Sequence, residues 1–339
     1  MHVAVDGRAL RPGTNRARGV ARYLRCLLDE LARAFPEDTY TVADLGSLRF
    51  AASAVTGRPR LDRLAPGCDL AWLPSPAPVA VSSGVPLVLT VHDLSFEHRP
   101  RDYGLYDRAW LRLARPARLA RRAERVVCSS DTTRSAVVEE WGVEARRTRT
   151  VLLGPGRATG KAGTVPLSVP EKFVLAVGAL EPRKLPGLLV DAHRQARDAG
   201  LRASLVFAGD GPLRAKLERS GATVLGHVPD AVLEALYEHA LAVSCVSREE
   251  GFGFTPLEAL VRGTPAVVTD LPVFDETVGA GALRVPPGDA AALANALLRL
   301  EREPELRERL ARAGGEAVAR LSWEDTARAT RAAFAEAAA

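Results

Sequence analysis

The sequence alternates throughout between short apolar runs and longer segments with helical periodicity, and this alternation is its strongest constraint on the fold. In the first half the apolar runs, several of them β-branched, are Val3–Val5, Tyr40–Leu45, Leu70–Leu73, Leu87–Val91, Val126–Cys128 and Val151–Leu153. Helical patterns lie between them at Val20–Phe35, Asp107–Ala123 and Thr132–Trp141. Short continuous apolar runs joined by helices are typical of parallel strands buried on both faces. We therefore expect an α/β fold with parallel sheets.

A second alternating set follows a stretch, Gly154 to Pro170, that is rich in Gly, Pro, Thr and Lys and is typical of a linker. Its apolar runs are Phe173–Gly178, Ser204–Gly209, Val224–Leu225, Ala242–Val246, Ala266–Thr269 and Leu283–Val285. Its helical patterns are Leu185–Ala199, Pro212–Arg219, Val232–His239, Thr255–Arg262, Ala290–Glu301 and Pro304–Arg320. We place one doubly wound, Rossmann-like domain at residues 1–165 and another at 166–320. Such sheets bind ligands at the carboxyl ends of their strands, so two of them offer a central cleft.

The composition fits this reading, because 339 residues suit two globular domains. Lys and Arg total 46 against 41 acidic residues, but only four are lysines, so arginine codon choice explains much of the net charge of +5. No basic patch interleaved with aromatics indicates nucleic-acid binding. No apolar run approaches the ~18 residues of a spanning helix, and no secretory signal is visible. The four dispersed cysteines predict reduced thiols, and we expect a cytoplasmic protein.

The most informative local pattern is the run Glu249-Glu250-Gly251-Phe252-Gly253-Phe254-Thr255-Pro256-Leu257-Glu258, which follows the strand-like Ala242–Ser247. Its glycines permit close approach of a ligand to the backbone. The backbone N–H groups at the helix start expected near Thr255 suit anionic or hydroxyl groups. Glu250 precedes this helix and Glu258 lies within it, so both can contact one extended ligand. The alternative is a glycine-rich turn in which Glu250 caps the helix and Glu258 lies on a solvated face.

Two other strand ends carry patterns typical of ligand binding. In Gly178-Ala179-Leu180-Glu181-Pro182-Arg183-Lys184, the adjacent cations lie at a strand-to-helix turn, where they suit the oxygens of a diphosphate. Codon choice does not account for Lys184, one of few lysines, although ordinary surface charge is the alternative. Gly209-Asp210-Gly211-Pro212 lacks the third glycine of the dinucleotide fingerprint and favours a tight turn at the cleft rim.

The first domain offers weaker candidates. In Val91-His92-Asp93-Leu94 a strand ends, and His92 and Asp93 are placed to act there as hydrogen-bonding or acid/base groups. A lone histidine is more often structural, so this position depends on the other motifs. The Arg-rich segment Asp107–Arg125 is expected as one amphipathic helix that contacts anionic lipid or a lipid-diphosphate acceptor. A solvated arginine face is the favoured alternative there.

Together these motifs resemble the family 4 glycosyltransferases of the GT-B fold, and especially bacterial mannosyltransferase-like members that build polysaccharides. The likeness covers nearly the whole chain and is carried by Gly19-Val20-Ala21-Arg22-Tyr23, Val91-His92-Asp93-Leu94-Ser95-Phe96, Cys128-Ser129-Ser130-Asp131, Glu181-Pro182-Arg183-Lys184, Gly209-Asp210-Gly211-Pro212, Gly226-His227-Val228-Pro229-Asp230, the run from Glu250 to Glu258, and Ser322-Trp323-Glu324-Asp325-Thr326-Ala327. The resemblance implies an acceptor-side first domain, a donor-binding second domain, and a C-terminal helix within 321–339 that crosses back onto the first.

The resemblance also implies the chemistry: retaining, metal-independent transfer of a hexose from a nucleotide-diphosphate sugar, without a further cofactor. Arg183 and Lys184 would hold the donor diphosphate, Glu250 the sugar hydroxyls and Glu258 the ribose. His92 and Asp93 would lie near the reacting centre. Backbone close to the donor would come from Gly19, Gly178, Gly209, Gly251, Phe252, Gly253, Phe254 and Thr255. The favoured donor is GDP-mannose, and the acceptor is a glycan, a lipid-linked molecule or a secondary metabolite.

Three positions depart from the family's pattern, namely Ala21, Leu185 and Thr255, and none of them removes a charge from the predicted site. Two alternatives stay open. One is another GT-B enzyme such as a sugar-nucleotide epimerase, and the other is a non-enzymatic two-lobed sugar-binding protein. A nicotinamide-dependent dehydrogenase is disfavoured, because its glycine fingerprint is absent.

Overall fold

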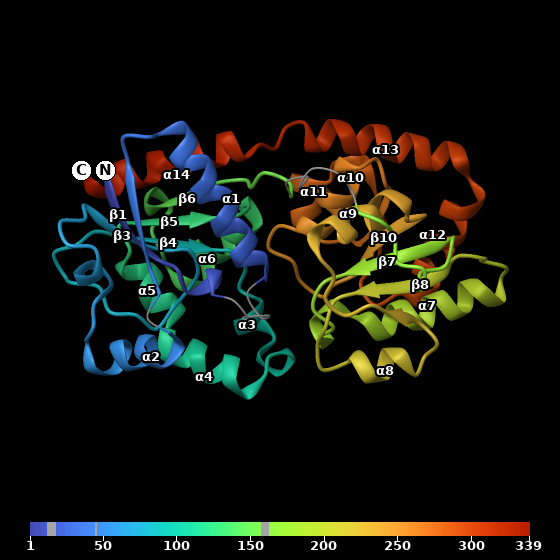
Figure 1. Ribbon diagram of the computed structural model, residues 1–339, viewed down its shortest axis with the longest axis horizontal. Coiled ribbons are helices and arrows are strands. Elements are labelled where there is room, and N and C mark those ends of the chain that lie inside the picture. The colour runs from blue at the N-terminus through green and yellow to red at the C-terminus, as the bar shows by residue number, and fades with distance from the viewer. Residues whose placement is uncertain (12–17, 45, 157–162) are drawn as a thin grey trace. The chain divides into compact units, whose positions relative to one another are not determined.

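A computed structural model describes residues 1–11, 18–44, 46–156 and 163–339, which form two compact units (Figure 1). Unit 1 comprises Met1–Gly154 and Leu321–Ala339, and unit 2 comprises Pro155–Arg320. The predicted boundary at residue 165 lies too far along the chain. The reason is that Gly163 N donates a 2.8 Å hydrogen bond to Ala231 O, which ties the end of the linker to unit 2.

Unit 1 contains a six-stranded parallel sheet in the order β2-β1-β3-β4-β5-β6. Its strands are β1 (His2–Asp6), β2 (Thr39–Ala43), β3 (Leu70–Leu73), β4 (Leu87–Val91), β5 (Arg125–Cys128) and β6 (Thr148–Thr150). Its described helices are α1 (Arg18–Ala34), α2 (Ser47–Thr56), α3 (Ser95–His98), α4 (Leu105–Ala114), α5 (Pro116–Arg122), α6 (Asp131–Trp141) and α14 (Trp323–Ala338). Short 3₁₀ turns are η1 (Arg8–Leu10), η3 (Leu61–Leu64), η4 (Pro100–Asp102) and η5 (Ala145–Arg147). Every residue of β3 and β4 is buried, as expected of strands covered on both faces.

Unit 2 contains a second six-stranded parallel sheet, in the order β12-β11-β10-β7-β8-β9. Its strands are β7 (Phe173–Val177), β8 (Ser204–Ala208), β9 (Thr223–Val224), β10 (Ala242–Cys245), β11 (Ala266–Thr269) and β12 (Ala282–Val285). Its helices are α7 (Pro186–Asp198), α8 (Arg214–Glu218), α9 (Asp230–His239), α10 (Phe254–Val261), α11 (Val273–Thr277), α12 (Ala290–Arg302) and α13 (Pro304–Val318), with 3₁₀ turns η6 (Pro182–Lys184) and η7 (Gly279–Gly281). None of the predicted helical patterns covers α2, α3 or α11, which are short or weakly periodic.

In each sheet, the direction in which successive strands are added reverses once. The change lies between β1 and β3 in unit 1 and between β7 and β10 in unit 2. Every strand pairing in the two sheets is parallel. The predicted fold class, α/β with two doubly wound parallel sheets, is therefore confirmed. Ligands of such sheets bind at these switch points, at the carboxyl ends of the strands.

One predicted strand is displaced. The apolar run Val151–Leu153 follows β6 instead of forming it. The backbone of this segment hydrogen-bonds to α14 instead. The hydroxyl of Thr326 donates to Leu152 O at 2.9 Å and accepts from Gly154 N at 3.0 Å. The last residue of the predicted strand Tyr40–Leu45, residue 45, lies outside the described residues.

The predicted Arg-rich helix is also wrong as a single element, because it is broken into α4 and α5. Arg115 between them has a left-handed φ of 49°, and Pro116 begins α5. Proline disfavours helical backbone at the residue before it, which explains the break. Arg121 and Arg122 donate to the backbone carbonyls of Trp141 and Val81 at 2.9 and 2.8 Å. The arginines therefore do not form one continuous lipid-facing surface.

The last helix, α14, completes the core of unit 1. Its Phe334 ring packs 5.2 Å from that of Trp72 in β3, and both side chains are fully buried. Ser322 caps its first turn by accepting from Asp325 N at 3.0 Å. Among the described residues, no helix has the length and apolar character needed to cross a membrane.

Candidate active site

The polar groups of unit 2 gather where its sheet changes direction, between β7 and β10. The chain leaves β7 at Gly178 and forms η6, which carries Arg183 and Lys184, before Pro186 begins α7. Arg183 Nη1 donates to Glu249 O at 3.2 Å, and Arg248 N donates to Arg183 O at 3.0 Å. These bonds join η6 to the segment that follows β10, so the two predicted motifs meet at one place.

Glu250 and Lys184 form an ion pair there. Ser247 Oγ donates a 2.6 Å hydrogen bond to the same carboxylate oxygen, Oε1, and Cys245 Sγ lies 3.8 Å from it. Within the described part of the chain, the second oxygen, Oε2, has no hydrogen-bond partner. The protein thus fixes one oxygen of Glu250 and leaves the other available as a hydrogen-bond acceptor.

The surroundings of Glu250 and Cys245 determine the protonation states of these two groups. Burial acts to raise the pKa of Glu250, but Lys184 and Arg183, with the hydrogen bonds from Lys184 and Ser247, outweigh it and hold that pKa below its ordinary value. Burial, with a further contribution from Glu250, raises the pKa of Cys245 to about 12. Near neutral pH the site therefore contains a carboxylate beside a neutral thiol.

Glu258 occupies the first turns of α10 and is 4% exposed. Tyr237 of α9 donates from its hydroxyl to Glu258 Oε2 at 2.8 Å. An ion pair joins the same region of the two helices, with Arg262 Nη2 3.3 Å from Glu234 Oε1 of α9 and both side chains buried. The alternative interpretation of this segment is wrong on both counts: Glu258 is not on a solvated face, and the N-cap of α10 is Gly253 with no side-chain cap.

Two glycines of the predicted site are required by packing. Gly253 has a left-handed φ of 84°, and a Cβ there would lie 2.6 Å from Phe274 Cε1. A Cβ at Gly209 would lie 1.8 Å from Gly178 O, so the turn after β8 needs glycine to fit against the turn after β7. Gly251 and Phe252 are buried beside them, while Phe254 and Thr255 are partly exposed at the start of α10. The predicted ligand contacts of these residues stay predictions.

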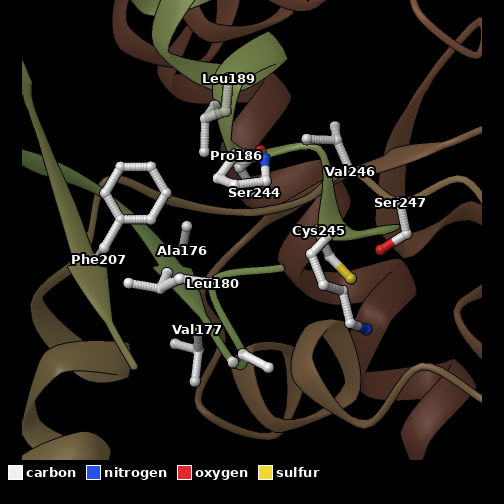
Figure 2. A pocket seen from close by; sticks show the side chains of 13 residues that line it. Ala176, Val177, Leu180, Pro186, Leu189, Phe207, Ser244, Cys245, Val246 and Ser247 are labelled. Atoms are coloured by element: carbon white, nitrogen blue, oxygen red, sulfur yellow. The ribbon is translucent and has the colours of Figure 1, made fainter. Parts of the chain in front are cut away.

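A small pocket of about 30 Å³ extends from the Lys184 side of this site toward the core (Figure 2). Its walls are mainly apolar, with Leu180, Leu189 and Phe207 among the lining residues. Figure 2 labels Pro186 and Ser244 among the lining residues, together with Cys245 and Ser247, which follow Ser244 along the chain. Ser244 Oγ is buried and has no partner within the described residues. A polar atom in a space of this size can be satisfied by one or two water molecules.

In unit 1, His92 lies directly after β4 and is partly buried. Its Nε2 is 2.9 Å from Pro74 O. A carbonyl can only accept, so Nε2 carries the hydrogen and Nδ1 is an acceptor. Burial lowers the pKa of His92, which makes a neutral imidazole the form present near pH 7. The His92 carbonyl accepts from Ser129 Oγ at 2.9 Å and Thr133 Oγ1 at 3.0 Å, so both ends of the residue are fixed.

The other predicted residues of unit 1 have simpler surroundings. Asp93 accepts from Ser95 N at 3.0 Å and Ser95 Oγ at 2.5 Å, so its carboxylate stabilises the turn into α3. Gly19 lies in the first turn of α1, and a Cβ there would meet no atom of the described residues within 4 Å. Packing against the described part of the chain therefore does not explain this glycine, and its predicted contact with the donor stays a prediction.

Sequence reasoning missed Ser247 and Tyr237, which hold Glu250 and Glu258. Ser247 had a usable signal, because a hydroxyl three residues before a carboxylate at a strand end can reach it. Tyr237 had none, since its contact depends on how α9 packs on α10. Among the described residues, no group of three or more His, Cys, Asp or Glu side chains is arranged to hold a metal ion.

Comparison with known families gives matches over most of the chain. Residues 164–317 match the model of the glycosyl transferases group 1, and residues 17–154 match that of glycosyltransferase family 4. The chain is 30% identical over 261 residues to the O-antigen chain mannosyltransferase B of Escherichia coli, a match that covers 70% of this chain and 67% of that protein.

The chain is also 38% identical over 162 residues to the phosphatidyl-myo-inositol mannosyltransferase of Mycobacterium leprae, with 45% of this chain and 43% of that protein covered. It spans less than two thirds of the length of the first curated relatives it matches. Among solved structures, HepE of Anabaena in complex with UDP and glucose superposes with a TM-score of 0.68 at 20% identity, over 98% of this chain and 99% of that one. This likeness shows the two-domain GT-B fold.

Proposed function

Because the chain belongs to the family 4 glycosyltransferases, we propose that it transfers a hexose from a nucleotide-diphosphate sugar to a glycan, lipid-linked or secondary-metabolite acceptor. We further propose retention of configuration and independence from a metal ion. The observation that carries the proposal is the cluster of Lys184, Arg183 and Glu250 at the switch point of unit 2. The names of the two matched relatives favour mannose, and the resemblance favours GDP as its carrier.

The leaving diphosphate gains negative charge as the bond to the anomeric carbon breaks. Lys184 and Arg183 would stabilise that charge, since fixed cations act most strongly where charge develops in the transition state. Lys184 Nζ has three N–H donors, so it can keep its bond to Glu250 while binding a phosphate oxygen. The free Oε2 of Glu250 would accept from sugar hydroxyls, and Glu258, held by Tyr237, would accept from the ribose.

Neither Glu250 nor Glu258 acts as a covalent nucleophile in the proposed mechanism. The leaving phosphate itself would take the proton of the acceptor hydroxyl, on the face from which it departs. His92 would contribute a neutral hydrogen-bonding group, because its Nε2 hydrogen is used by Pro74 O and its pKa is lowered by burial. Asp93 would support the turn beside it.

The donor is tested first, by thermal unfolding of the full chain with GDP, UDP, ADP and dTDP. A ligand that binds only the folded state stabilises it by about 2.7 kcal/mol at a hundred times its Kd, so the correct nucleotide should raise Tm clearly. We expect GDP to give the largest shift, and Glu258→Gln to reduce that shift. If no nucleotide stabilises the chain, the proposed function is wrong.

Turnover of the matching nucleotide-sugar separates the remaining alternatives. A transferase gives a glycoside whose anomeric configuration, assigned by NMR, matches that of the donor, and EDTA leaves the rate unchanged. An epimerase gives a changed nucleotide-sugar instead. A sugar-binding protein gives neither product.

A second proposal concerns the surface of α4. Leu105 is 81% exposed and Leu113 is 42% exposed, and Arg108 and Arg112 are exposed on the same helix. Apolar side chains interspersed with arginine suit an anionic membrane surface. We propose that α4 contacts anionic lipid. The arginines of α5, which hydrogen-bond to backbone carbonyls, do not.

Sedimentation with vesicles tests this contact. The chain should bind phosphatidylglycerol-containing vesicles more than phosphatidylcholine vesicles, and Arg108→Ala with Arg112→Ala should remove the difference. Arg146→Ala is the control, because Arg146 is 81% exposed elsewhere in unit 1. Equal binding to both vesicles would rule the contact out.

A further inference from the structure

The switch point of unit 1 carries a cation that the reaction described above does not use. Arg8 begins η1, two residues after Asp6 ends β1. Between β1 and β3 the strand order of this sheet changes direction, which is where doubly wound sheets bind ligands. Arg8 and Ser75, which follow these two strands, therefore lie at the expected ligand position of unit 1.

Three groups hold the Arg8 side chain in place and leave it 14% exposed. Its Nη2 donates to Ser75 Oγ at 3.4 Å and lies 3.6 Å from Asp6 Oδ2. Its guanidinium carbon lies 4.4 Å from the centre of the Trp110 ring of α4, within the range of a cation–π contact. A guanidinium held this way has lost most of its freedom before any ligand arrives, which lowers the entropic cost of binding.

Its hydrogen-bonding capacity is nevertheless mostly unused. A guanidinium has five N–H donors, and within the described residues Nε and Nη1 of Arg8 have no partner. Arg11, three residues later, shows what full pairing looks like, because its Nε and Nη2 bond to the two carboxylate oxygens of Asp44 at 3.1 and 2.8 Å. The 3.6 Å separation of Arg8 from Asp6 is longer than a hydrogen bond. Arg8 is thus more than a counterion for Asp6.

We propose that Arg8 binds an anionic group, a phosphate or a carboxylate, on the acceptor substrate, and that unit 1 selects acidic acceptors through it. This inference rests on the proposed function, because a sugar-transfer enzyme needs an acceptor site besides the donor site. Nε and Nη1 would donate to oxygens of the anion, while Trp110 and Ser75 keep the guanidinium in position. Arginine suits this task because its charge is permanent and its planar donors match oxyanions.

The test compares anionic probes with neutral probes of similar shape, by calorimetric titration of the full chain. One pair is myo-inositol 1-phosphate with myo-inositol, and the other is glucuronic acid with glucose. Charge-assisted hydrogen bonds predict at least about tenfold tighter binding of the anionic member of one pair, which also tells phosphate from carboxylate. Arg8→Gln should remove most of that preference, and Arg8→Lys should restore part of it. Arg146→Gln, on an exposed arginine of unit 1, should change nothing.

Arg8→Gln leaves Asp6 buried without its cation, so the double variant Asp6→Asn with Arg8→Gln is measured as well. It removes both charges and should stay folded while losing the preference for the anionic probe. If the wild type does not prefer either anionic probe, or if the preference survives in the folded Arg8 variants, the inference is overturned. Nucleotide binding is measured in parallel, since its absence would contradict the proposed donor site in unit 2 and leave the anion result readable on its own.

Discussion

The two sheets have the same design, six parallel strands with one change of direction, but the charged groups at their switch points are paired differently. In unit 2 opposite charges are already in contact, as Lys184 and Glu250 form an ion pair that Ser247 supports. In unit 1 the switch point between β1 and β3 carries Arg8, whose Nη2 lies 3.6 Å from Asp6 Oδ2, beyond hydrogen-bond distance. Under the proposed function, the close ion pair of unit 2 suits a reacting centre whose charge changes, and the loosely paired Arg8 of unit 1 suits an acceptor whose charge stays constant.

The largest effect is expected from removing the cation of unit 2. Lys184→Ala should lower kcat at least about 100-fold with the fold unchanged, because a preorganised donor at the leaving group is worth roughly 3–4 kcal/mol. Steady-state kinetics with the matching nucleotide-sugar measures it. Lys216→Ala is the matched control, since Lys216 is exposed on α8 of the same unit. Near-normal turnover of Lys184→Ala would remove the charge-based contrast between the units.

A second contrast concerns glycines, one from each unit. Gly209→Ala should destabilise the chain by about 1–3 kcal/mol, because the new Cβ would lie 1.8 Å from Gly178 O. Gly19→Ala should leave the free energy of unfolding unchanged or slightly higher, since a Cβ there meets no atom of residues 1–11, 18–44, 46–156 or 163–339 within 4 Å. Urea unfolding measures both. A loss of stability in Gly19→Ala would show that packing, and not a ligand, explains the glycine of unit 1.

Removing the hydroxyl that positions Glu250 should have a smaller effect. Ser247→Ala should lower kcat/KM about tenfold, because a hydrogen bond to a charged group is worth about 1.5 kcal/mol or more. The hydrogen bond helps to lower the pKa of Glu250, so its loss raises that pKa and moves the acid limb of the pH–rate profile upward. Ser247→Thr should restore both. An acid limb that does not move would mean that Ser247 is merely structural.

The smallest expected effect is the pH dependence contributed by His92. Burial lowers the pKa of His92 in the folded state, so the unfolded chain binds the proton more readily as pH falls. The contribution of neutral His92 to the free energy of unfolding is therefore fully present at pH 7.5. It is lost as the pH drops below about 6.5, the pKa of an unfolded histidine, toward the lower pKa of the folded state. His92→Gln should make the unfolding free energy fall less steeply as the pH drops below about 6.5. An unchanged slope in His92→Gln would contradict a neutral His92 in the folded chain.

Much of the fold follows from local patterns. Leu70–Leu73 and Leu87–Val91 are β3 and β4 residue for residue, because both are continuous apolar runs that the sheet buries on two faces. The displaced strand near Val151 could not be found this way, since its backbone bonds to Thr326, which lies far along the chain. The break at Pro116 could have been found, because proline restricts Arg115 before it.

The candidate site divides in the same way. Arg183, Lys184 and Glu250 were found because each follows a strand in an unusual local pattern, and the structure brings them together. Arg8 was missed because its meaning lies in contacts with Ser75 and Trp110, from other strands and helices. No property of Arg8 itself distinguishes it from the other arginines of an arginine-rich chain.

The assignment of α14 to unit 1 has a consequence for how the chain is made. Unit 2 is an insertion within unit 1, because unit 1 begins at Met1 and finishes only with the last segment. During synthesis the chain emerges in order, so residues 155–320 can complete their core while Trp72 still lacks its partner Phe334. Unit 1 therefore cannot complete its core until residues 321–339 have been synthesised, and a chain interrupted before residue 321 would carry a folded unit 2 and an incomplete unit 1.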